Sequence, residues 1–457
     1  MKVLKRRISA SRTPLLVFAA ALVTAVPASA TAADRSAQHP LAQAVWENVR
    51  GDEELLIFYQ QHRFRPLWIE AGRIGPQALA LLDLLGSAEA DGLESSDYLY
   101  PALSSAISNS ELGASDHLAR LEIALSRAFV AYMRDVREVR DADIVYGEPS
   151  LRPLPASAWE VLSAAAEAPS LVDYVREMAW MNPIYTGLRQ SIAEAIAKAG
   201  TTPDLGLLQL NLERARALPA REDPYILVDA AAAQLTVFDG GEAQETMRVV
   251  VGAPEDATPM MVGMLRYATL NPYWHVPPDL TRERIAPRVI DEGMSYFRGR
   301  GYEVVDDWVS GQVIDPRTID WQAVADGSIE LFIRQKPGPR NGMGKIKFQF
   351  PNNLGIYLHD TPAKHLFELD NRSASAGCVR LEDADALAAI LFGEQPMPQS
   401  TEPEQTLHLP EPVPVYITYL TAVPENGRIV RREDIYGWDD EEPASVAAKA
   451  EQGEGAL

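Results

Sequence analysis

The hydrophobic period of this chain changes near Tyr225, and that change limits the fold more than any other feature of the sequence. Before this point, apolar residues recur at the three- and four-residue spacing of a buried helix face. After it, short apolar stretches such as 225–229 and 234–238 have a period of two and are separated by glycine turns, which is typical of paired strands. The sequence therefore predicts an α+β multidomain protein with an all-helical scaffold domain over 41–200, a helical connector over 201–224 and a mostly β, sandwich-like domain over 225–438.

Between residues 280 and 327 the strand rhythm of the second half is replaced by a helical and loop-like pattern, which predicts an inserted helical unit, and the strand rhythm returns at about Ile329. An insertion of this length into a β domain is expected to be either a disordered loop or a lid. The aromatic residues Tyr296, Trp308 and Trp321 argue against disorder, because disordered segments are poor in such side chains.

The first thirty residues have the composition of a secretion signal. A basic start is followed by an apolar run from Leu15 to Val26 and by the small residues Ala28-Ser29-Ala30. The apolar run has about a dozen residues, fewer than the roughly 20 that a membrane-spanning helix needs. The sequence predicts a signal peptide over 1–30 and a linker over 31–40, with no transmembrane span; an uncleaved anchor is the alternative.

The chain is strongly acidic, with a formal net charge of −22. The predicted signal holds five cations and no acid, so its removal would change the net charge from −22 to −27. This excess argues against nucleic acid or an anionic membrane surface as a partner, because both require basic patches. The residues after Trp438 are acidic and rich in alanine, which predicts a disordered tail over 439–457.

Cys378 is the only cysteine of the chain, and His359 is one of seven histidines. In an exported protein, structural cysteines come in pairs, so a solitary thiol is either an inert core residue or a reactive one. A strand that ends at His359, is broken by Thr361-Pro362 and is followed by a returning loop would bring the two side chains together. A helix predicted after Leu381 would place the thiol near a helix N-terminus, where the dipole and Arg380 favour a thiolate.

These residue types predict acyl transfer in two steps. Deprotonated by His359, the Cys378 thiolate attacks a carbonyl to give a thioester, which an amine then displaces. The backbone N–H groups of Gly377 and Cys378 are the expected oxyanion donors, and Tyr357 is either a third donor or a wall of the groove. The base needs an orienting acceptor, for which the residues alone suggest the Asp360 carboxylate.

Four further residues are candidates for binding the substrate. Arg380 could bind a carboxylate in bidentate fashion or fix its own loop. Ser375 is expected to hydrogen-bond the loop backbone, as is Ser373. Asn341 and Arg334 could contact the substrate or hold a hinge of the insertion.

The remaining histidines offer weaker possibilities. His275 could line the groove or simply pack in its proline-flanked turn, and His365 is expected to lie outside the site. A zinc site of His359, His365 and Cys378 matches no compact zinc spacing. No metal and no organic cofactor is therefore expected.

Eighteen residues separate His359 from Cys378, which lies in the segment Ser375–Arg380, Ser-Ala-Gly-Cys-Val-Arg. Upstream are Arg334-Gln-Lys-Pro-Gly-Pro-Arg-Asn and Lys345-Ile-Lys-Phe-Gln-Phe-Pro-Asn. Together these motifs resemble the L,D-transpeptidase (YkuD-type) catalytic domain, and within that family they are most similar to the large periplasmic YcbB-like branch. Phe64–Trp68 and Asp91–Tyr98 resemble the scaffold of the same branch. The residues between Pro183 and Asp223 are too few for the peptidoglycan-binding module of ordinary size that many members of that branch carry.

The resemblance implies a fold and a reaction. It implies a mobile lid over 280–327 that caps the groove, and it implies that the Asp360 backbone carbonyl orients the histidine. The donor would be a peptidoglycan tetrapeptide stem, acylated at the L-centre carbonyl of diaminopimelate with release of D-alanine. The acceptor would be the amine of another diaminopimelate, which gives a 3→3 cross-link in the periplasm, and carbapenems would acylate Cys378.

Three other functions stay open on the sequence. Water in place of the amine would make the protein a cysteine-dependent cell-wall hydrolase. A protein amine would make it an enzyme that attaches proteins to peptidoglycan. A non-catalytic wall-binding scaffold is disfavoured because both His359 and Cys378 are present. The sequence does not predict an oligomeric state.

Overall fold

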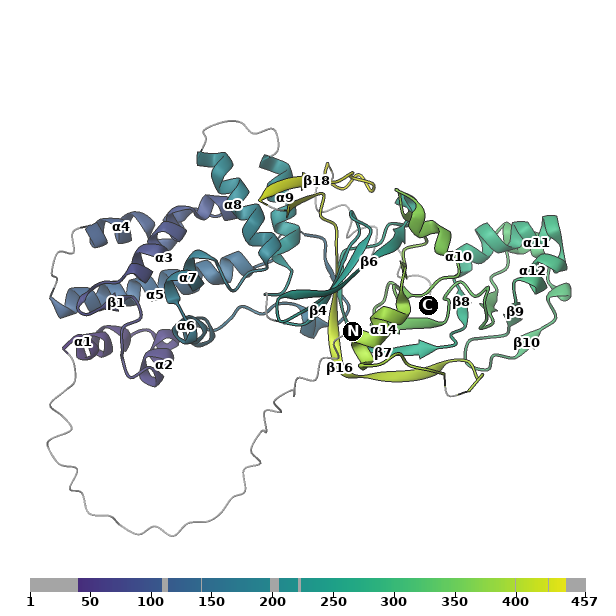
Figure 1. The fold of residues 1–457 in the computed structure, drawn as a ribbon, viewed down its shortest axis with the longest axis horizontal. Coiled ribbons are helices and arrows are strands. Elements are labelled where there is room, and N and C mark those ends of the chain that lie inside the picture. Colours follow the sequence, from purple (N-terminus) through teal and green to yellow (C-terminus); the bar gives the residue numbers. More distant parts are fainter. Residues whose placement is uncertain are drawn as a thin grey trace, which may run out of the picture.

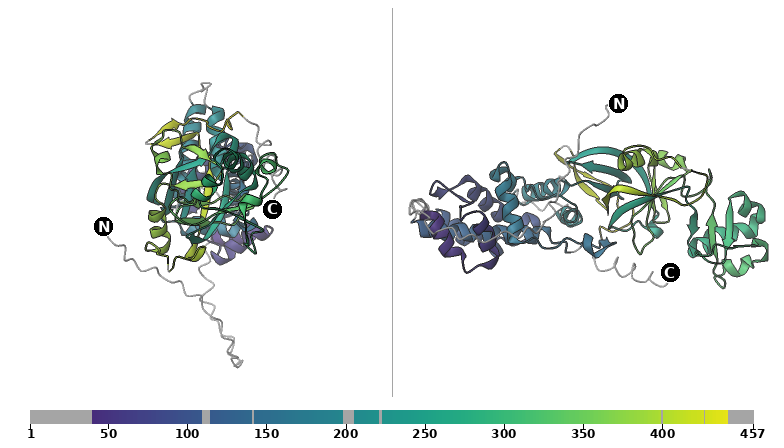
Figure 2. Two further views of the ribbon diagram at one scale, coloured as in Figure 1. Left: turned by 90° about the vertical axis from the view of Figure 1, so that its right-hand side faces the viewer. Right: turned by 90° about the horizontal axis from the view of Figure 1, so that it is seen from below.

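The computed structural model describes residues 40–108, 114–140, 142–197, 205–220, 223–398, 400–425 and 427–440. The predicted signal peptide lies outside the described residues, as do the predicted linker except for Pro40 and the predicted tail except for its first two residues. Figures 1 and 2 show an elongated molecule in which a helical half, a β domain and a capping unit follow one another along the long axis. Within the described ranges, no helix combines the length and the apolar character needed to cross a membrane.

The helical half is built around one long helix, α5 (Ser115–Arg137), whose buried face carries Leu121, Leu125 and Phe129. These residues recur every three or four positions, which is the periodicity of one helix face. The other helices of this half are α1 (Pro40–Val49), α2 (Glu53–Gln61), α3 (Pro76–Gly86), α4 (Tyr100–Ser108), α6 (Ala158–Glu167), α7 (Leu171–Arg176), α8 (Pro183–Ala197) and α9 (Leu205–Arg216). Short strands β1 (Ile69–Glu70) and β2 (Arg73–Ile74) form a small hairpin between α2 and α3.

A buried carboxylate organises the segment that leads to this hairpin. Glu122 of α5 accepts hydrogen bonds from the backbone N–H groups of Leu67, Trp68 and Ile69 and from the Tyr59 hydroxyl, at 2.6 to 3.2 Å. The Glu122 side chain is fully buried, so each of these donors offsets part of the cost of removing the carboxylate from water. The Trp68 ring beside it is also fully buried and belongs to the core.

The β domain is a mixed sheet whose strands are hydrogen-bonded in the order β12-β13-β15-β6-β5-β4-β16-β7-β3. Because β12 also pairs with β7, the path closes on itself, and the two layers of the predicted sandwich form one continuous sheet. The strands are β3 (Val145–Tyr146), β4 (Tyr225–Asp229), β5 (Gln234–Asp239), β6 (Glu242–Gly252), β7 (Met261–Leu270), β12 (Ile346–Gln349), β13 (Leu358–His359), β14 (Ser373–Ser375), β15 (Val379–Leu381) and β16 (Gln405–Thr418). The predicted class, a helical half followed by a mostly β domain, is confirmed.

Two local predictions in the β domain are wrong. The prolines between Pro396 and Pro414 predict a loop over 396–414, but part of this stretch is strand, because β16 already begins at Gln405. The register against β7 shifts between His408 and Val413, and such a bulge accommodates prolines that cannot donate to the ladder. The helix expected after Leu381 is α14 (Ala384–Phe392), but strand β15 separates it from Cys378, so the thiol does not lie at a helix N-terminus.

The two halves are joined by strand β3 in the first third of the chain and by a hairpin near its C-terminal end. Strand β3 leaves the helical half and pairs in parallel with β7 of the large sheet. The terminal hairpin of β17 (Ala422–Glu425) and β18 (Arg428–Arg431) returns to the helical half, where Asn211 of α9 donates to Thr421 at 3.0 Å. Figure 1 shows this hairpin beside α8 and α9.

The capping unit comprises residues 274–335 and contains both helices and strands. Strands β8 (Trp274–Val276), β9 (Tyr302–Val305), β10 (Val313–Ile314) and β11 (Phe332–Gln335) form a sheet of order β10-β9-β11-β8. Its helices are α10 (Pro278–Leu280), the π-helical turn η5 (Thr281–Ile285), α11 (Ala286–Glu292), α12 (Met294–Gly299) and α13 (Trp321–Ala325). Phe297, Trp321 and Ile333 form a small hydrophobic core of its own, so the aromatic residues of the insertion pack as a folded unit.

Candidate active site

The predicted nucleophile and base lie at the ends of two neighbouring strands. Strands β13 and β15 pair in parallel, with Leu358 opposite Val379 and His359 opposite Arg380. Side chains alternate between the two faces of a strand, so Leu358 and Val379 point together into the core, where both are fully buried. His359 and Arg380 therefore point together to the other face.

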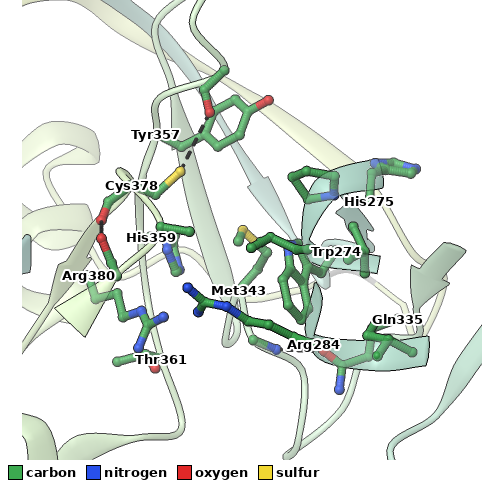
Figure 3. A pocket seen from close by; sticks show the side chains of 18 of the residues that line it. Trp274, His275, Arg284, Gln335, Met343, Tyr357, His359, Thr361, Cys378 and Arg380 are labelled. Carbon is green, nitrogen blue, oxygen red and sulfur yellow. Dashed lines mark hydrogen bonds between the residues drawn. The ribbon is translucent and has the colours of Figure 1, made fainter. Parts of the chain in front are cut away.

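One position earlier, Tyr357 and Cys378 share that same face. The Val379 N–H donates to the Tyr357 carbonyl at 3.0 Å, which continues the pairing beyond the two strands. Four side chains from two adjacent strands, namely Tyr357, His359, Cys378 and Arg380, are thus gathered on one surface, as Figure 3 shows. The sequence predicted this meeting from a strand, a break and a returning loop.

The backbone around Cys378 is held on both sides of the sulfur. Gly377 has a φ of +91°, a conformation that favours glycine, and its carbonyl accepts a hydrogen bond from the Thr258 hydroxyl at 2.7 Å. The Ser375 hydroxyl donates to the Cys378 carbonyl at 2.6 Å, as expected for a serine that fixes this loop. The partly buried thiol faces the Gly355 carbonyl at 3.5 Å.

The imidazole of His359 is oriented by a backbone carbonyl. Its Nδ1 lies 2.6 Å from the Asp360 carbonyl oxygen, and the ring is 2% exposed. A carbonyl can only accept, so Nδ1 carries the proton and Nε2 keeps the lone pair that a general base needs. The Asp360 carboxylate is engaged elsewhere, because it accepts from the Lys345 N–H at 2.9 Å and from the Lys364 ammonium at 2.8 Å.

The electrostatics of the pair favour two neutral groups before substrate binds. Burial, together with the neighbouring Arg380 cation, lowers the pKa of His359 to about 3. Burial raises the pKa of the Cys378 thiol, while the Tyr357 backbone N–H and the cations Lys347 and Arg380 oppose that rise. The resting site therefore holds a neutral thiol and a neutral imidazole on one face.

Lys347 is a site residue to which the sequence analysis gave no role. It lies on β12 directly opposite His359, so its side chain shares the face of the four residues above. Its Nζ is 3.6 Å from the centroid of the Tyr357 ring, and burial lowers the pKa of the ammonium. The available signal was a lysine between the apolar residues Ile346 and Phe348 of a short strand.

A cavity of about 1540 Å³ opens above this surface, between the β domain and the capping unit. The β domain contributes Cys378, His359 and Arg380 to its lining, and the capping unit contributes Trp274 and Arg284 among others. Figure 3 shows the Trp274 and Arg284 side chains facing His359 and Arg380 across the cavity. His275 also lines it, with its ring 4.7 Å from that of Trp308.

Asn341 and Arg334 are placed at the base of the capping unit, and neither is among the described residues that line the cavity. The Asn341 amide is buried and donates to the carbonyls of Pro272 at 2.9 Å and Gln335 at 3.2 Å, so it joins the two segments that enter and leave the unit. Arg334 pairs with Glu303 at 3.1 Å and lies 4.4 Å from the Tyr273 ring centroid. Of the two roles that the sequence left open, these contacts favour the hinge.

The three residues suggested as zinc ligands, His359, His365 and Cys378, do not lie together. His365 is exposed and does not line the cavity with the other two suggested ligands. In the part of the chain that the structure describes, no group of three histidine, cysteine, aspartate or glutamate side chains is arranged to hold a metal ion.

Family comparisons agree with this geometry. Residues 223–393 match the family of L,D-transpeptidase catalytic domains, and residues 53–192 match the scaffold-domain family. A provisionally named L,D-transpeptidase of Haemophilus influenzae is 32% identical over 283 residues, a match that covers 60% of this chain and 57% of that protein. The matched region thus spans little more than half the length of this relative.

Solved structures of similar proteins include an L,D-transpeptidase from Mycobacterium smegmatis, which is 15% identical, with 43% of this chain and 58% of that chain covered and a TM-score of 0.21. A cysteine-to-serine mutant of the Enterococcus faecium L,D-transpeptidase is 14% identical, with 50% and 64% covered and a TM-score of 0.22. Scores this low do not establish a shared overall arrangement.

Proposed function

We propose that this chain, which belongs to the L,D-transpeptidase family through its catalytic domain at residues 223–393, forms 3→3 cross-links between peptidoglycan stem peptides through a thioester on Cys378. The observation that carries the proposal is the parallel pairing of β13 and β15, which sets the thiol and the imidazole on one face at the floor of the cavity. The donor is a tetrapeptide stem, and the acceptor is the side-chain amine of a second diaminopimelate.

In the first step the proton of the Cys378 thiol passes to Nε2 of His359, and the Sγ–C bond forms at the donor carbonyl. The resulting tetrahedral oxyanion collapses when the C–N bond to the terminal D-alanine breaks. The proton held by His359 goes to that leaving amine. The products of this step are free D-alanine and a thioester.

The oxyanion needs donors that are not already engaged. Among the described residues, the backbone N–H groups of Gly377 and Cys378 donate to no protein acceptor, so both are available to the developing charge. Burial raises the pKa of Tyr357, which keeps its hydroxyl protonated and able to donate as a third partner. Lys347 and Arg380 add positive charge on the same face.

In the second step the acceptor amine attacks the thioester carbonyl, and His359 takes the proton that the amine loses. The Sγ–C bond then breaks, and the proton returns from the imidazole to the sulfur. A cavity of about 1540 Å³ exceeds the roughly 300–1,000 Å³ of a site for one small molecule, so it has room for parts of two peptide chains. This room favours an amine acceptor over water.

The periplasm is the compartment proposed for this reaction, because the first thirty residues have the composition of a secretion signal. The strong excess of acidic residues is consistent with a partner other than nucleic acid.

The test is product analysis with purified tetrapeptide-bearing muropeptides. The proposal predicts release of D-alanine together with a dimer whose cross-link joins two diaminopimelate residues, identified by fragmentation in a mass spectrometer. Tripeptide monomers without dimers would assign a hydrolase that uses the same thioester. Formation of neither product by folded protein would overturn the proposal.

A further inference from the structure

The cavity has the opposite charge balance from the rest of the protein. The whole chain has 64 acidic and 42 basic residues. The cavity is instead lined by two acidic side chains, Asp279 and Glu283, against six basic ones. The basic residues are Arg284, Arg288, Arg300, Arg340, Lys347 and Arg380.

Most of these cations have no anionic partner within the protein. Arg284 pairs with Asp256 at 3.2 Å, and the acidic Glu283 is taken by Arg282, which does not line the cavity. For the other five basic residues, no carboxylate of a described residue lies within 4 Å of the charged group. A gathering of unpaired cations in an acidic protein implies a ligand that supplies the missing negative charge.

Two of these cations are prearranged on the capping unit. Arg288 in the first turn of α11 and Arg300 just after α12 both lie over the ring of Tyr296, with their guanidinium carbons 5.7 Å and 5.9 Å from the ring centroid. The Tyr296 ring also contacts that of Tyr302, which belongs to β9. Stacking against a fixed ring restricts each guanidinium, so less conformational entropy is lost when it binds a carboxylate.

We propose that this Arg288–Tyr296–Arg300 cluster binds a free carboxylate of the substrate peptide, and that the protein therefore selects peptides with free carboxyl groups over peptides in which those groups are amidated. The inference rests on the proposed function, since it concerns a substrate of the same cavity. A guanidinium offers only donors, and a carboxylate offers two acceptor oxygens in a matching geometry. An amide presents its own donors to the same cluster and carries no charge, so it leaves the cations unpaired.

The cluster lies on the capping unit and not on the catalytic strands. It is therefore expected to determine which peptide is held and not how fast the bound carbonyl reacts. Loss of either guanidinium should raise KM and leave kcat nearly unchanged, because the contact is made equally in the bound substrate and in the transition state.

The experiment compares two donor peptides that differ only in whether their side carboxyl groups are free or amidated. The proteins are the wild type, Arg288→Gln, Arg300→Gln and the double variant. Arg298→Gln is the matched control, because Arg298 is an exposed arginine of the same helix α12 that does not line the cavity. Thermal unfolding of each variant checks the fold, and both substituted side chains are exposed.

The wild type should use the free-carboxylate peptide with a kcat/KM at least about tenfold above that for the amidated peptide, the effect of one charge-assisted hydrogen bond. Each single variant should raise KM for the free peptide about threefold and leave the amidated peptide unaffected, so that the roughly tenfold preference disappears in the double variant. Arg298→Gln should behave as the wild type.

The outcomes separate this inference from the proposed function. If the wild type forms cross-links equally well from both peptides, or if the variants lose activity on both alike, the carboxylate subsite is refuted while the transpeptidase assignment stands. If the wild type forms no thioester with either peptide, both the inference and the proposed function are overturned.

Discussion

The helical half and the cavity beneath the capping unit both contain charged side chains, but these charges are paired in opposite ways. In the helical half, Asp91 is buried and accepts from Arg189 at 2.9 Å and from the hydroxyls of Tyr132 and Tyr185 at 2.7 Å. Glu122 is likewise surrounded by donors. These carboxylates have partners within the protein, so the contacts hold helices and loops together.

In the cavity most of the cations lack such partners, Arg284 being the exception. Lys347 and Arg380 have no carboxylate of a described residue within 4 Å, and the buried ring of His359 keeps Nε2 without a hydrogen-bond partner in the described chain. Both cations are partly buried, and partly buried cations without a partner concentrate where a ligand or a reaction intermediate supplies the missing charge. In this molecule, the buried carboxylates with protein partners stabilise the helical half, whereas the cations without carboxylate partners lie in the candidate active site.

Cys378→Ala, in the cavity, should have the largest effect on cross-linking activity. The proposal predicts a loss of cross-linking of about 10⁴-fold or more, because no other thiol is present to form the acyl intermediate. The unfolding midpoint should be unchanged, since a small side chain that is partly exposed is removed. Retained turnover in the folded variant would exclude Cys378 as the nucleophile.

His359→Gln should have the next largest effect on activity. Without a base at Nε2, thioester formation should slow by about 10² to 10⁴-fold, the usual contribution of general base catalysis. The rate of a single acylation, followed by stopped-flow or by mass, measures this step directly. His365→Gln is the matched control, because His365 is exposed and lies outside the cavity lining. Equal acylation rates in both variants would remove the base role.

Glu122→Gln tests the structural side of the comparison. The amide replaces one acceptor oxygen with a donor that faces backbone N–H groups or the Tyr59 hydroxyl, and each donor left unsatisfied costs about 1–3 kcal/mol. Denaturant unfolding should show this loss of stability. The cross-linking activity per folded molecule should stay at the wild-type value, and a specific loss of kcat would show that this charge acts on the site.

Lys347→Met tests whether the Lys347 charge favours the thiolate form of Cys378. Removing a cation that opposes the high pKa of Cys378 should make thiolate formation harder and slow acylation by about tenfold, the effect of one unit in the pKa. The apolar methionine keeps the contact with the Tyr357 ring. Lys345→Met, at an exposed position of the same segment, is the control, and identical acylation rates for both variants would contradict a role for Lys347.

The acid stability of the fold should report the burial of His359. Its pKa falls from the usual 6.5 to about 3 in the folded chain, so the unfolded chain binds the proton more readily between these values. The contribution of neutral His359 to the free energy of unfolding is therefore fully present above about pH 6.5. It is lost as the pH falls toward 3, by at most about 1.4 kcal/mol per pH unit. The unfolding free energy of the wild type minus that of His359→Gln should decrease as the pH falls from 6.5 toward 3. A difference that does not depend on pH would contradict the burial effect.

Much of the fold could be predicted from the sequence, because local sequence patterns coincide with the helices and strands of the structure. The change of period at Tyr225 coincides with the start of β4, and the stretch from Gln234 coincides with β5. The approach of His359 and Cys378 could be predicted because a strand, a Thr-Pro break and a glycine before the sulfur permit little else.

What the sequence did not reveal depends on contacts between distant segments. The short strand β15 is created by pairing with β13 and β6 and not by its own three residues, so Cys378 was wrongly expected at a helix N-terminus. Lys347 shows its role only because β12 places it opposite His359. Residues 405–414 form a strand because they pair with β7, and a bulge between His408 and Val413 accommodates the prolines in this pairing.

The most direct test of the paired thiol and imidazole is reaction of the purified protein with a carbapenem, followed by intact-mass and peptide-mass measurement. The account predicts a single covalent adduct on the peptide that contains Cys378, formed rapidly in the wild type, slowly in His359→Gln and not at all in Cys378→Ala. Folded wild-type protein that remains unmodified, or that carries the adduct on another residue, would contradict it.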